Sequence, residues 1–182
     1  SIKEDGSIPS EALSHLCPRS TDFLCFKELS FHDDKELTVS NLYAHHTETR
    51  YRTSNGHTRT EHVEVTDFLG QVFSLCLPIN FSGHLRVVPT KKSFLFTREV
   101  NGVYPGARGD EVQIETEDIR NNENYNIYCT DELSARKFLT PKMLEWFDRQ
   151  ISQNAMCVFL KDKKLFISLY TDRYIFPTPQ KP

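Results

Sequence analysis

Alternation of apolar and polar residues over long stretches predicts that the chain is mostly β-structure. Residues 36–52 alternate over their whole length, and residues 58–79 alternate again after Asn55 and Gly56. An Asn-Gly pair favours a type I′ turn, because both central residues of that turn have positive φ. The pattern therefore predicts one long antiparallel hairpin across this turn.

A two-residue turn also fixes the register of the two strands, because it sets which residues lie opposite each other. The predicted pairs are Arg52 with Arg59, Arg50 with Glu61, Thr49 with His62, His45 with Thr66 and Tyr43 with Phe68. Opposite charges at Arg50 and Glu61 and aromatic rings at Tyr43 and Phe68 favour this register. Gly70 predicts a bulge or bend where the hairpin turns onto the core.

Shorter apolar runs predict further strands on both sides of this hairpin. They are residues 23–31, 83–90, 93–100, 111–118 and 124–130. Residues 155–160 and 165–170 predict a second hairpin, with the charged residues 161–164 as its turn. Strands of this number and length are expected to form one largely antiparallel sheet.

Residues 131–151 contain two helix-start signals. Thr130 or Asp131 can cap a first helix at about residues 131–138. Pro141 predicts a second helix at about residues 141–151, because proline suits the first helical position and disfavours helix in the residue before it. An apolar stripe on this second helix is formed by Met143, Leu144, Phe147 and Ile151. The predicted fold is α+β, a largely antiparallel sheet of about seven or eight strands with this broken helix pair packed on it.

The length of 182 residues is enough for one domain with a continuous core. Residues 1–22 predict an N-terminal extension that is polar and rich in turn formers, with a short helix at residues 8–16. Residues 23–176 are expected to form the globular domain, and residues 177–182 a proline-rich tail. Hydrophobic residues at 38% and charged residues at 26% are typical of a folded chain and not of a disordered one.

Charge and cysteine content narrow the possible roles. A formal charge of −3 gives the chain no general attraction for nucleic acid or anionic lipid. Five cysteines without a CxxC pair predict buried free thiols in a reducing compartment, and they argue against a cysteine-based zinc site. The longest apolar run is far shorter than the ~20 residues of a transmembrane helix. The chain begins with serine and shows no signal-peptide pattern, so we expect a fragment excised from a longer protein.

Several short motifs follow one another in a fixed order along the chain. Between residues 114 and 150 they are carried by Glu117, Asp118, Thr130, Asp131, Ala135, Arg136, Leu139, Thr140, Pro141, Met143, Leu144 and Glu145. Earlier positions of the same kind are Phe68, Gly70, Phe73, Phe81, Gly83, Val87, Val88 and Pro89. Over roughly residues 24–176 the chain therefore resembles an uncharacterised bacterial domain family of unknown function, sometimes labelled "galanin" in genome annotation.

This resemblance implies a structural role for the signature residues Asp118, Asp131, Arg136, Leu139 and Pro141, because the family has no established catalytic residues. It also implies a domain on the cytoplasmic face of a bacterial membrane, attached through a hydrophobic segment upstream of the chain. We therefore expect a non-enzymatic interaction module of a membrane-attached protein. Its partner would be another protein or lipid headgroups.

Cys129 supports the alternative hypothesis, a thiol-dependent hydrolase or a small-ligand-binding domain centred on the helix start. A helix N-terminus lowers the pKa of a nearby thiol, which would activate it. The alternation of Cys129 with Ile127 instead favours a cysteine that points into the core. A ligand-binding role would need a deep pocket beside the helix break.

Charged side chains suggest two further sites. A loose basic cluster of Arg86, Lys91, Lys92 and Arg98 can contact lipid headgroups, although a solvated strand face explains the same residues. An acidic group of Glu115, Glu117 and Asp118 can supply an acid–base pair or bind a cation. No Gly-rich calcium loop accompanies the acidic group, so a solvated strand is the expectation there too.

Histidines and one tripeptide complete the candidates. His45, His46 and His62 suggest a metal site, but the predicted register separates His45 from His62 by about 13 Å along the strands. Residues 107–110 contain Arg-Gly-Asp, an adhesion tripeptide whose glycine and aspartate are more typical of a polar turn. We therefore expect no metal, no cofactor, no nucleic-acid partner and no identifiable small-molecule substrate.

Overall fold

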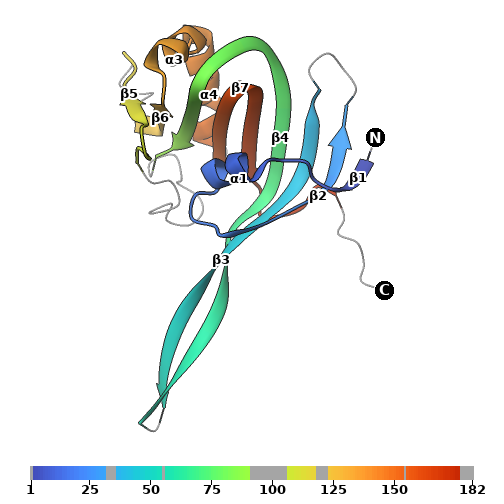
Figure 1. Ribbon diagram of the computed structural model, residues 1–182, viewed down its shortest axis with the longest axis vertical. Coiled ribbons are helices and arrows are strands. Elements are labelled where there is room, and N and C mark those ends of the chain that lie inside the picture. Colours follow the sequence, from blue (N-terminus) through green and yellow to red (C-terminus); the bar gives the residue numbers. More distant parts are fainter. Residues whose placement is uncertain are drawn as a thin grey trace.

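The computed structural model describes residues 2–31, 36–54, 56–90, 106–117, 123–153 and 155–176. These residues form a seven-stranded sheet in the order β1-β2-β3-β4-β6-β5, with β7 also paired to β4 (Figure 1). The strands are β1 (Ile2–Asp5), β2 (Asp22–Ser30), β3 (Thr38–Ser54), β4 (His57–Pro89), β5 (Val112–Ile114), β6 (Tyr125–Cys129) and β7 (Ala155–Tyr170), and the helices are α1 (Ser10–Leu16), α3 (Glu132–Phe138) and α4 (Pro141–Gln153). The strand pairs are antiparallel, so the predicted α+β class is confirmed.

The long hairpin is formed by β3 and β4, and its outer part, residues 46–54 and 56–65, extends from the body as a two-stranded arm (Figure 1). The predicted register of the arm is confirmed, with Arg52 opposite Arg59, Arg50 opposite Glu61 and Thr49 opposite His62. Asn55 lies outside the described residues, while Gly56 has the positive φ of 76° that the turn requires.

The predicted pair of Tyr43 with Phe68 is wrong by one residue. His45 lies opposite Thr66 as predicted, but Ala44 then lies opposite Phe68, so that Asp67 is an extra residue on β4. A β-bulge of this kind re-aims a side chain. Asp67 accepts a hydrogen bond from Ser20 at 2.9 Å and contacts Nδ1 of His46 at 2.8 Å, which ties the base of the arm to the loop before β2.

A sharp bend shared by β4 and β7 is the main departure from the predicted strands. The runs predicted as separate strands at residues 58–79 and 83–90 belong to one strand, β4, and residues 155–170 form one strand, β7. Both strands bend back on themselves, with β7 inside the bend of β4 (Figure 1). The predicted second hairpin is therefore a bent strand that pairs with β4 on both sides of its charged bend at residues 161–164.

The geometry of the bend explains why the sequence pattern predicted more strands than β4 and β7. Between the pairs Gly70–Tyr170 and Val87–Val158, β4 advances 17 residues while β7 advances 12. The outer strand of a bend follows the longer path, so it needs the extra residues and takes them up as bulges. The predicted strand at residues 93–100 lies outside the described residues, and β1 was not predicted because its sequence is polar.

The broken helix pair is confirmed. Asp131 caps α3, and its carboxylate accepts a hydrogen bond from the Ser134 amide at 2.9 Å. Helix α4 begins at Pro141, where the hydroxyl of Thr140 accepts a hydrogen bond from the Met143 amide at 3.3 Å. In the part of the chain that the structure describes, no helix is long and apolar enough to cross a membrane.

Two hydrophobic clusters cover the two faces of the sheet. Val87, Ile127 and Val158 belong to the cluster that packs on α3 and α4. Their sequence neighbours belong to the cluster that packs on α1, namely Val88, Tyr128 and Phe159. Because successive residues of a strand point to opposite faces, α1 covers one face and the helix pair covers the other.

Gly70 lies where β4 and β7 approach each other closely, and not at the bulge or bend that the sequence predicted. We therefore expect this position to tolerate no side chain. The register is regular there, but a Cβ would lie 2.1 Å from the backbone carbonyl oxygen of Leu169 on β7. We expect Gly70→Ala to lower the free energy of unfolding by about 2–3 kcal/mol, measured by urea denaturation, because the strands must separate to admit a methyl group.

Gly106→Ala is the matched control for this substitution. Among the described residues, its Cβ would meet nothing nearer than the Tyr128 hydroxyl at 3.9 Å, which is ordinary van der Waals contact. The free energy of unfolding of Gly106→Ala should stay close to that of the parent protein. Equal stability of the two variants would contradict the close approach of β4 and β7 at Gly70.

Candidate functional site

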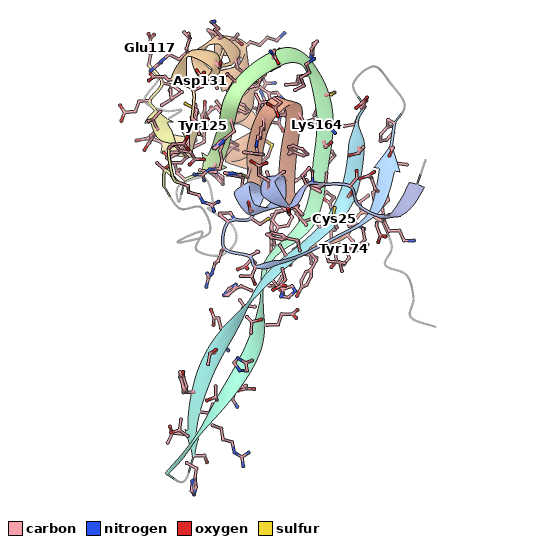
Figure 2. All side chains as sticks on the ribbon, in the orientation of Figure 1. Cys25, Glu117, Tyr125, Asp131, Lys164 and Tyr174 are labelled. Atoms are coloured by element: carbon pink, nitrogen blue, oxygen red, sulfur yellow. The ribbon has the colours of Figure 1, made fainter. Side chains whose placement is uncertain are left out.

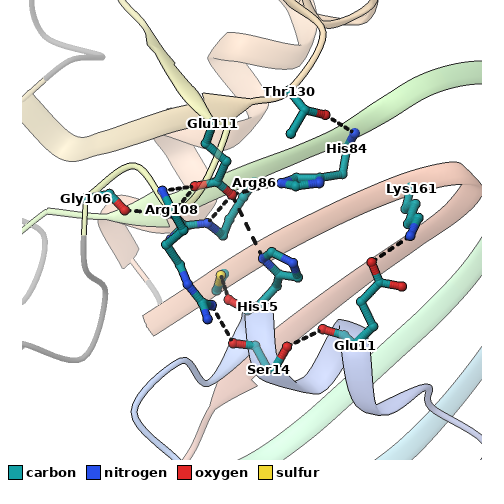
Figure 3. Close-up of polar contacts among 11 residues, drawn as sticks. Glu11, Ser14, His15, His84, Arg86, Gly106, Arg108, Glu111, Thr130 and Lys161 are labelled. Atoms are coloured by element: carbon teal, nitrogen blue, oxygen red, sulfur yellow. Dashed lines mark hydrogen bonds and ion pairs between the residues drawn. The ribbon is translucent and has the colours of Figure 1, made fainter.

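The first candidate site is a buried cluster of charged and imidazole groups between α1 and the sheet (Figure 3). His84 and Arg86 come from β4, two residues apart, so both point to the face that α1 covers. His15 comes from α1, and Glu111 from the turn that leads into β5. The side chains of Arg86 and Glu111 are both fully buried.

Glu111 accepts hydrogen bonds on both carboxylate oxygens. Arg86 donates from Nε to Oε1 at 3.1 Å and from Nη2 to Oε2 at 2.6 Å. The Arg108 amide also donates to Oε2, at 2.9 Å, and Nε2 of His84 lies 2.9 Å from Oε1. Burial disfavours the charged carboxylate, but the hydrogen bonds from His84, Arg86 and Arg108 outweigh it and lower the pKa of Glu111 to about 2. The carboxylate is therefore ionised and matched by the Arg86 charge.

His15 closes the cluster on the helix side. Its ring stacks on Phe159 of β7 at 4.3 Å between centroids, and its Nδ1 lies 3.9 Å from Oε1 of Glu111. Nδ1 is buried and has no hydrogen-bond partner among the described residues. Burial and the neighbouring charges of His84 and Arg108 lower the pKa of His15 to about 4. This imidazole is therefore neutral near pH 7.

Arg86 corrects part of the predicted headgroup cluster. Its side chain has no exposed surface, it lies over the ring of Tyr128 at 4.7 Å, and it is paired with Glu111. It cannot reach a lipid surface without unfolding this region. The other three residues of that prediction, Lys91, Lys92 and Arg98, lie outside the described residues.

The sequence carries one signal that could have indicated this cluster. Arg86 stands in the apolar run of residues 85–88, and an arginine in a buried strand needs a buried partner. Pattern alone could not identify that partner, because Glu111 is 25 residues away and its turn has no regular periodicity. His15 and His84 come together only because α1 folds back over the sheet.

The predicted turn at residues 107–110 contributes to the same cluster. The amide of Glu111 donates to the carbonyl of Arg108 at 3.0 Å, and Gly109 has a positive φ of 59°. The guanidinium of Arg108 donates to the carbonyl of Ser14 on α1 at 3.0 Å. The turn therefore fastens α1 to Glu111.

The hairpin histidines lie near different groups and do not converge on one point. His46 contacts Asp67 at 2.8 Å and Glu48 at 3.2 Å, while His62 contacts the Thr49 hydroxyl at 3.3 Å. His45 lies 3.8 Å from Glu64. Among the described residues, the group of three possible ligand residues that the structure does bring together is His15, His84 and Glu111.

Cys129 lies at the end of β6 and is completely buried in the cluster that packs on the helix pair. Burial raises the pKa of its thiol, and the carboxylates of Glu132 and Asp131 raise it further. The acidic residues that suit the start of α3 therefore oppose the activation that a helix N-terminus would provide. This environment suits a core thiol more than a nucleophile.

The second candidate site is an open groove beside the helix break, with a volume of about 700 Å³. It is lined by Ile114, Glu115, Thr116, Glu117, Arg136, Leu139, Pro141, Leu144, Glu145 and Asp148. Figure 2 shows Glu117 at the end of the molecule that is formed by β5 and the helix pair. Three signature residues meet in this groove, Arg136, Leu139 and Pro141, while Asp131 serves as the cap of α3. Asp118 lies outside the described residues.

Within the described part of the chain, some charged side chains of the groove have partners of opposite charge and others do not. Arg136 pairs with Glu132 at 2.7 Å, and Glu145 pairs with Arg149 at 3.3 Å. Asp148 accepts a hydrogen bond from the Asn124 amide group. Among the described residues, Glu115 and Glu117 have no hydrogen-bond or ion-pair partner, and both are exposed. The rim of the groove is therefore acidic, over an apolar floor.

Removing Arg86 is expected to destabilise the protein strongly. Arg86→Met leaves the Glu111 carboxylate buried without its main countercharge, which typically costs about 3–5 kcal/mol. The double variant Arg86→Met/Glu111→Leu removes both charges and should recover most of that loss. The measurement is the free energy of unfolding from urea denaturation of both variants.

Arg136→Met provides the control, because Arg136 pairs with Glu132 at the exposed surface. Exposed pairs of this kind contribute little, so its stability should stay near that of the parent protein. If Arg86→Met were as stable as Arg136→Met, the pair with Glu111 would not be a structural anchor.

Comparison with known proteins gives a family and a distant structural likeness. No curated protein sequence matches the chain. The crystal structure of the mycobacterial trehalose monomycolate transport factor A, TtfA, is similar with a TM-score of 0.40 and 9% sequence identity, over 70% of this chain and 61% of that chain. The family model described as "Protein of unknown function (DUF3137)" matches residues 66–181, which is more than half of the chain. The chain therefore belongs to this family of unknown function, as the resemblance of its motifs implied.

Proposed function

We propose that this domain is a non-enzymatic interaction module that binds a segment of a partner protein in the groove beside the helix break. The observation that carries the proposal is the groove itself, which combines an apolar floor with an acidic rim. Its volume of about 700 Å³ falls within the range of known ligand sites. The preferred segment would carry apolar side chains and basic side chains together.

The apolar floor favours binding of an apolar side chain of the partner over binding of a small ion. Ile114 is buried, and Leu139 and Leu144 are partly buried around the break between α3 and α4. An apolar side chain placed on them removes surface from water on both partners, at roughly 25 cal/mol per Å². Because Pro141 begins a second helix in a new direction, the break leaves this surface uncovered by either helix.

The acidic rim supports a basic partner and disfavours an anionic one. The groove is lined by four carboxylates and one guanidinium, and the guanidinium of Arg136 is already paired with Glu132. Lysine or arginine side chains of a partner would meet Glu115 and Glu117 on arrival. Anionic lipid headgroups would be repelled at the same surface, so a protein partner is favoured over headgroups.

The cellular setting is a further part of the proposal. The family resemblance supports a parent protein attached to a bacterial membrane, with this domain on the cytoplasmic face. Free thiols at all five cysteines suit a reducing compartment. A thiol-dependent hydrolase is the alternative, and the burial of Cys129 weighs against it.

A synthetic peptide of alternating lysine and leucine is the direct probe of the groove, with binding followed by fluorescence anisotropy. We expect the parent protein to bind it, and the double variant Glu115→Lys/Glu117→Lys to bind it at least about tenfold more weakly because attraction becomes repulsion. The affinity should also fall as salt is added.

The control is Glu61→Lys/Glu64→Lys, which makes the same charge change on exposed residues of the arm. Its affinity for the peptide should match that of the parent protein. Equal loss in both double variants would mean that net charge alone binds the peptide, and the groove proposal would fail. Tight binding of a free polyamine in place of the peptide would favour the small-ligand alternative.

A further inference from the structure

We propose that His15, His84 and Glu111 form a binding site for a divalent transition metal ion of the zinc class, which joins α1 to the sheet. This site lies on the face of the sheet that α1 covers, away from the groove, and it is independent of the proposed function. The three residues come from α1, from β4 and from the turn before β5 (Figure 3).

The positions of the possible ligand atoms suit a small cation. Nε2 of His84 lies 2.9 Å from Oε1 of Glu111, and Nδ1 of His15 lies 3.9 Å from the same oxygen. All three ligand atoms lie within 4.8 Å of one another. Zinc binds nitrogen and oxygen at about 2.0–2.2 Å, so tetrahedral geometry separates two ligand atoms by about 3.4 Å. The 4.8 Å limit exceeds this spacing by about 1.4 Å, which two side chains remove if each moves by about 0.7 Å.

Nδ1 of His15 is the observation that points to a missing ligand. It is buried, it faces the carboxylate of Glu111, and no hydrogen bond satisfies it in the described part of the chain. A buried polar atom without a partner is costly, and coordination of a metal ion would satisfy this nitrogen. The ring is also held in place by its stack on Phe159, so the nitrogen cannot easily turn to solvent.

Binding would move a proton within His84. In the metal-free state the ionised Glu111 carboxylate can only accept, so the proton between Nε2 of His84 and Oε1 of Glu111, which are 2.9 Å apart, belongs to Nε2. On binding to a neutral His84 imidazole, the Nε2–H bond breaks and an Nδ1–H bond forms on the same ring, with water carrying the proton between the two nitrogens. Bonds from the metal to Nε2, to Oε1 and to Nδ1 of His15 form, and no atom is oxidised or reduced. Histidine ligates a metal in this neutral form.

Arg86 and Arg108 would act as the outer shell of the site. They hold Oε2 of Glu111 through hydrogen bonds of 2.6 and 2.9 Å, and Arg86 also holds Oε1. Hydrogen bonds of this kind orient a ligating carboxylate and are a common part of metal sites. Because Arg86 already balances the charge of Glu111, the metal gains less attraction than at an unpaired carboxylate, and we expect moderate affinity.

The ligand set also predicts selectivity and access. Two imidazole nitrogens and one carboxylate oxygen suit zinc, cobalt or nickel, whereas magnesium and calcium prefer sites built from oxygen alone. The side chains of His15 and His84 are each 15% exposed, so a metal can enter from solvent. Three protein ligands leave a fourth position for water.

Thermal unfolding of the tag-free chain with and without Zn²⁺ tests the proposal. At a free zinc concentration of ten times Kd we expect the midpoint to rise by about 3–6 °C. Magnesium at the same concentration should give no rise. The variant His15→Phe keeps an aromatic ring against Phe159 but has no ligand atom, so the zinc-dependent rise should disappear while the metal-free midpoint is retained.

His62→Phe on the arm is the matched control, and it should show the full zinc-dependent rise. Binding of Co²⁺ gives a second readout, because its visible absorption reports nitrogen ligands and low coordination number. The proposal is overturned if zinc gives no rise in the parent protein, or if His15→Phe responds to zinc as His62→Phe does. A His15→Phe variant that fails to fold is replaced by His84→Gln, for which the same loss of the cobalt spectrum is expected.

Discussion

The ion pair of Arg86 with Glu111 is the constraint on which the arrangement of the domain depends. Both side chains are fully buried, and an unpaired charge at this depth would be far too costly for a domain of ordinary stability. Meeting that demand brings the turn at residues 106–111 against β4, although the two are distant in sequence. The same turn holds α1 through Arg108 and Ser14. One charge pair therefore fixes where three separate segments lie.

The bend shared by β4 and β7 supplies the surface that receives this pair. β4 pairs with β3 before the bend and with β6 after it, while β7 follows the inner edge on both sides. This one strand thus carries the arm, Gly70 and the Arg86 anchor in succession. Alternation along it sends Arg86 and His84 to the face of α1, and Leu85 and Val87 to the face of the helix pair. The two candidate sites are separated by the thickness of the sheet for this reason.

Local physical signals predicted those parts of the structure that depend on neighbours in sequence. The register of the arm follows from its turn, and the helix break follows from Asp131 and Pro141, so both could be predicted. The bulge at Asp67 and the extra residues of β4 could not, because they are fixed by contacts with Ser20 and with β7. For the same reason the sequence pattern predicted two strands where the structure has the single strand β4. Bulges at a bend interrupt the alternation of apolar and polar residues that marks a strand.

The candidate sites also differ in how far the sequence could predict them. Leu139 and Pro141 were identified by their helix-start chemistry, and they line the groove because the break exposes them. The cluster of His15, His84 and Glu111 was missed, because its members are related only through the folded chain. His45 and His46 are adjacent in sequence, yet they lie near different carboxylates, those of Glu64 and Glu48. Proximity in sequence is therefore a poor guide to ligand sets in a sheet whose strands bend.

The short strand β5 connects the two sites and gives the buried ion pair a consequence at the groove. β5 has three residues and pairs with β6 at Val112, Gln113 and Ile114, which is a weak hold for an edge strand. Glu111 immediately before it is anchored by Arg86, and Glu115 and Glu117 after it line the groove. The anchor therefore limits how far the acidic rim can move relative to Leu139 and Pro141. In this arrangement, charge buried on one face of the sheet positions charge exposed on the other.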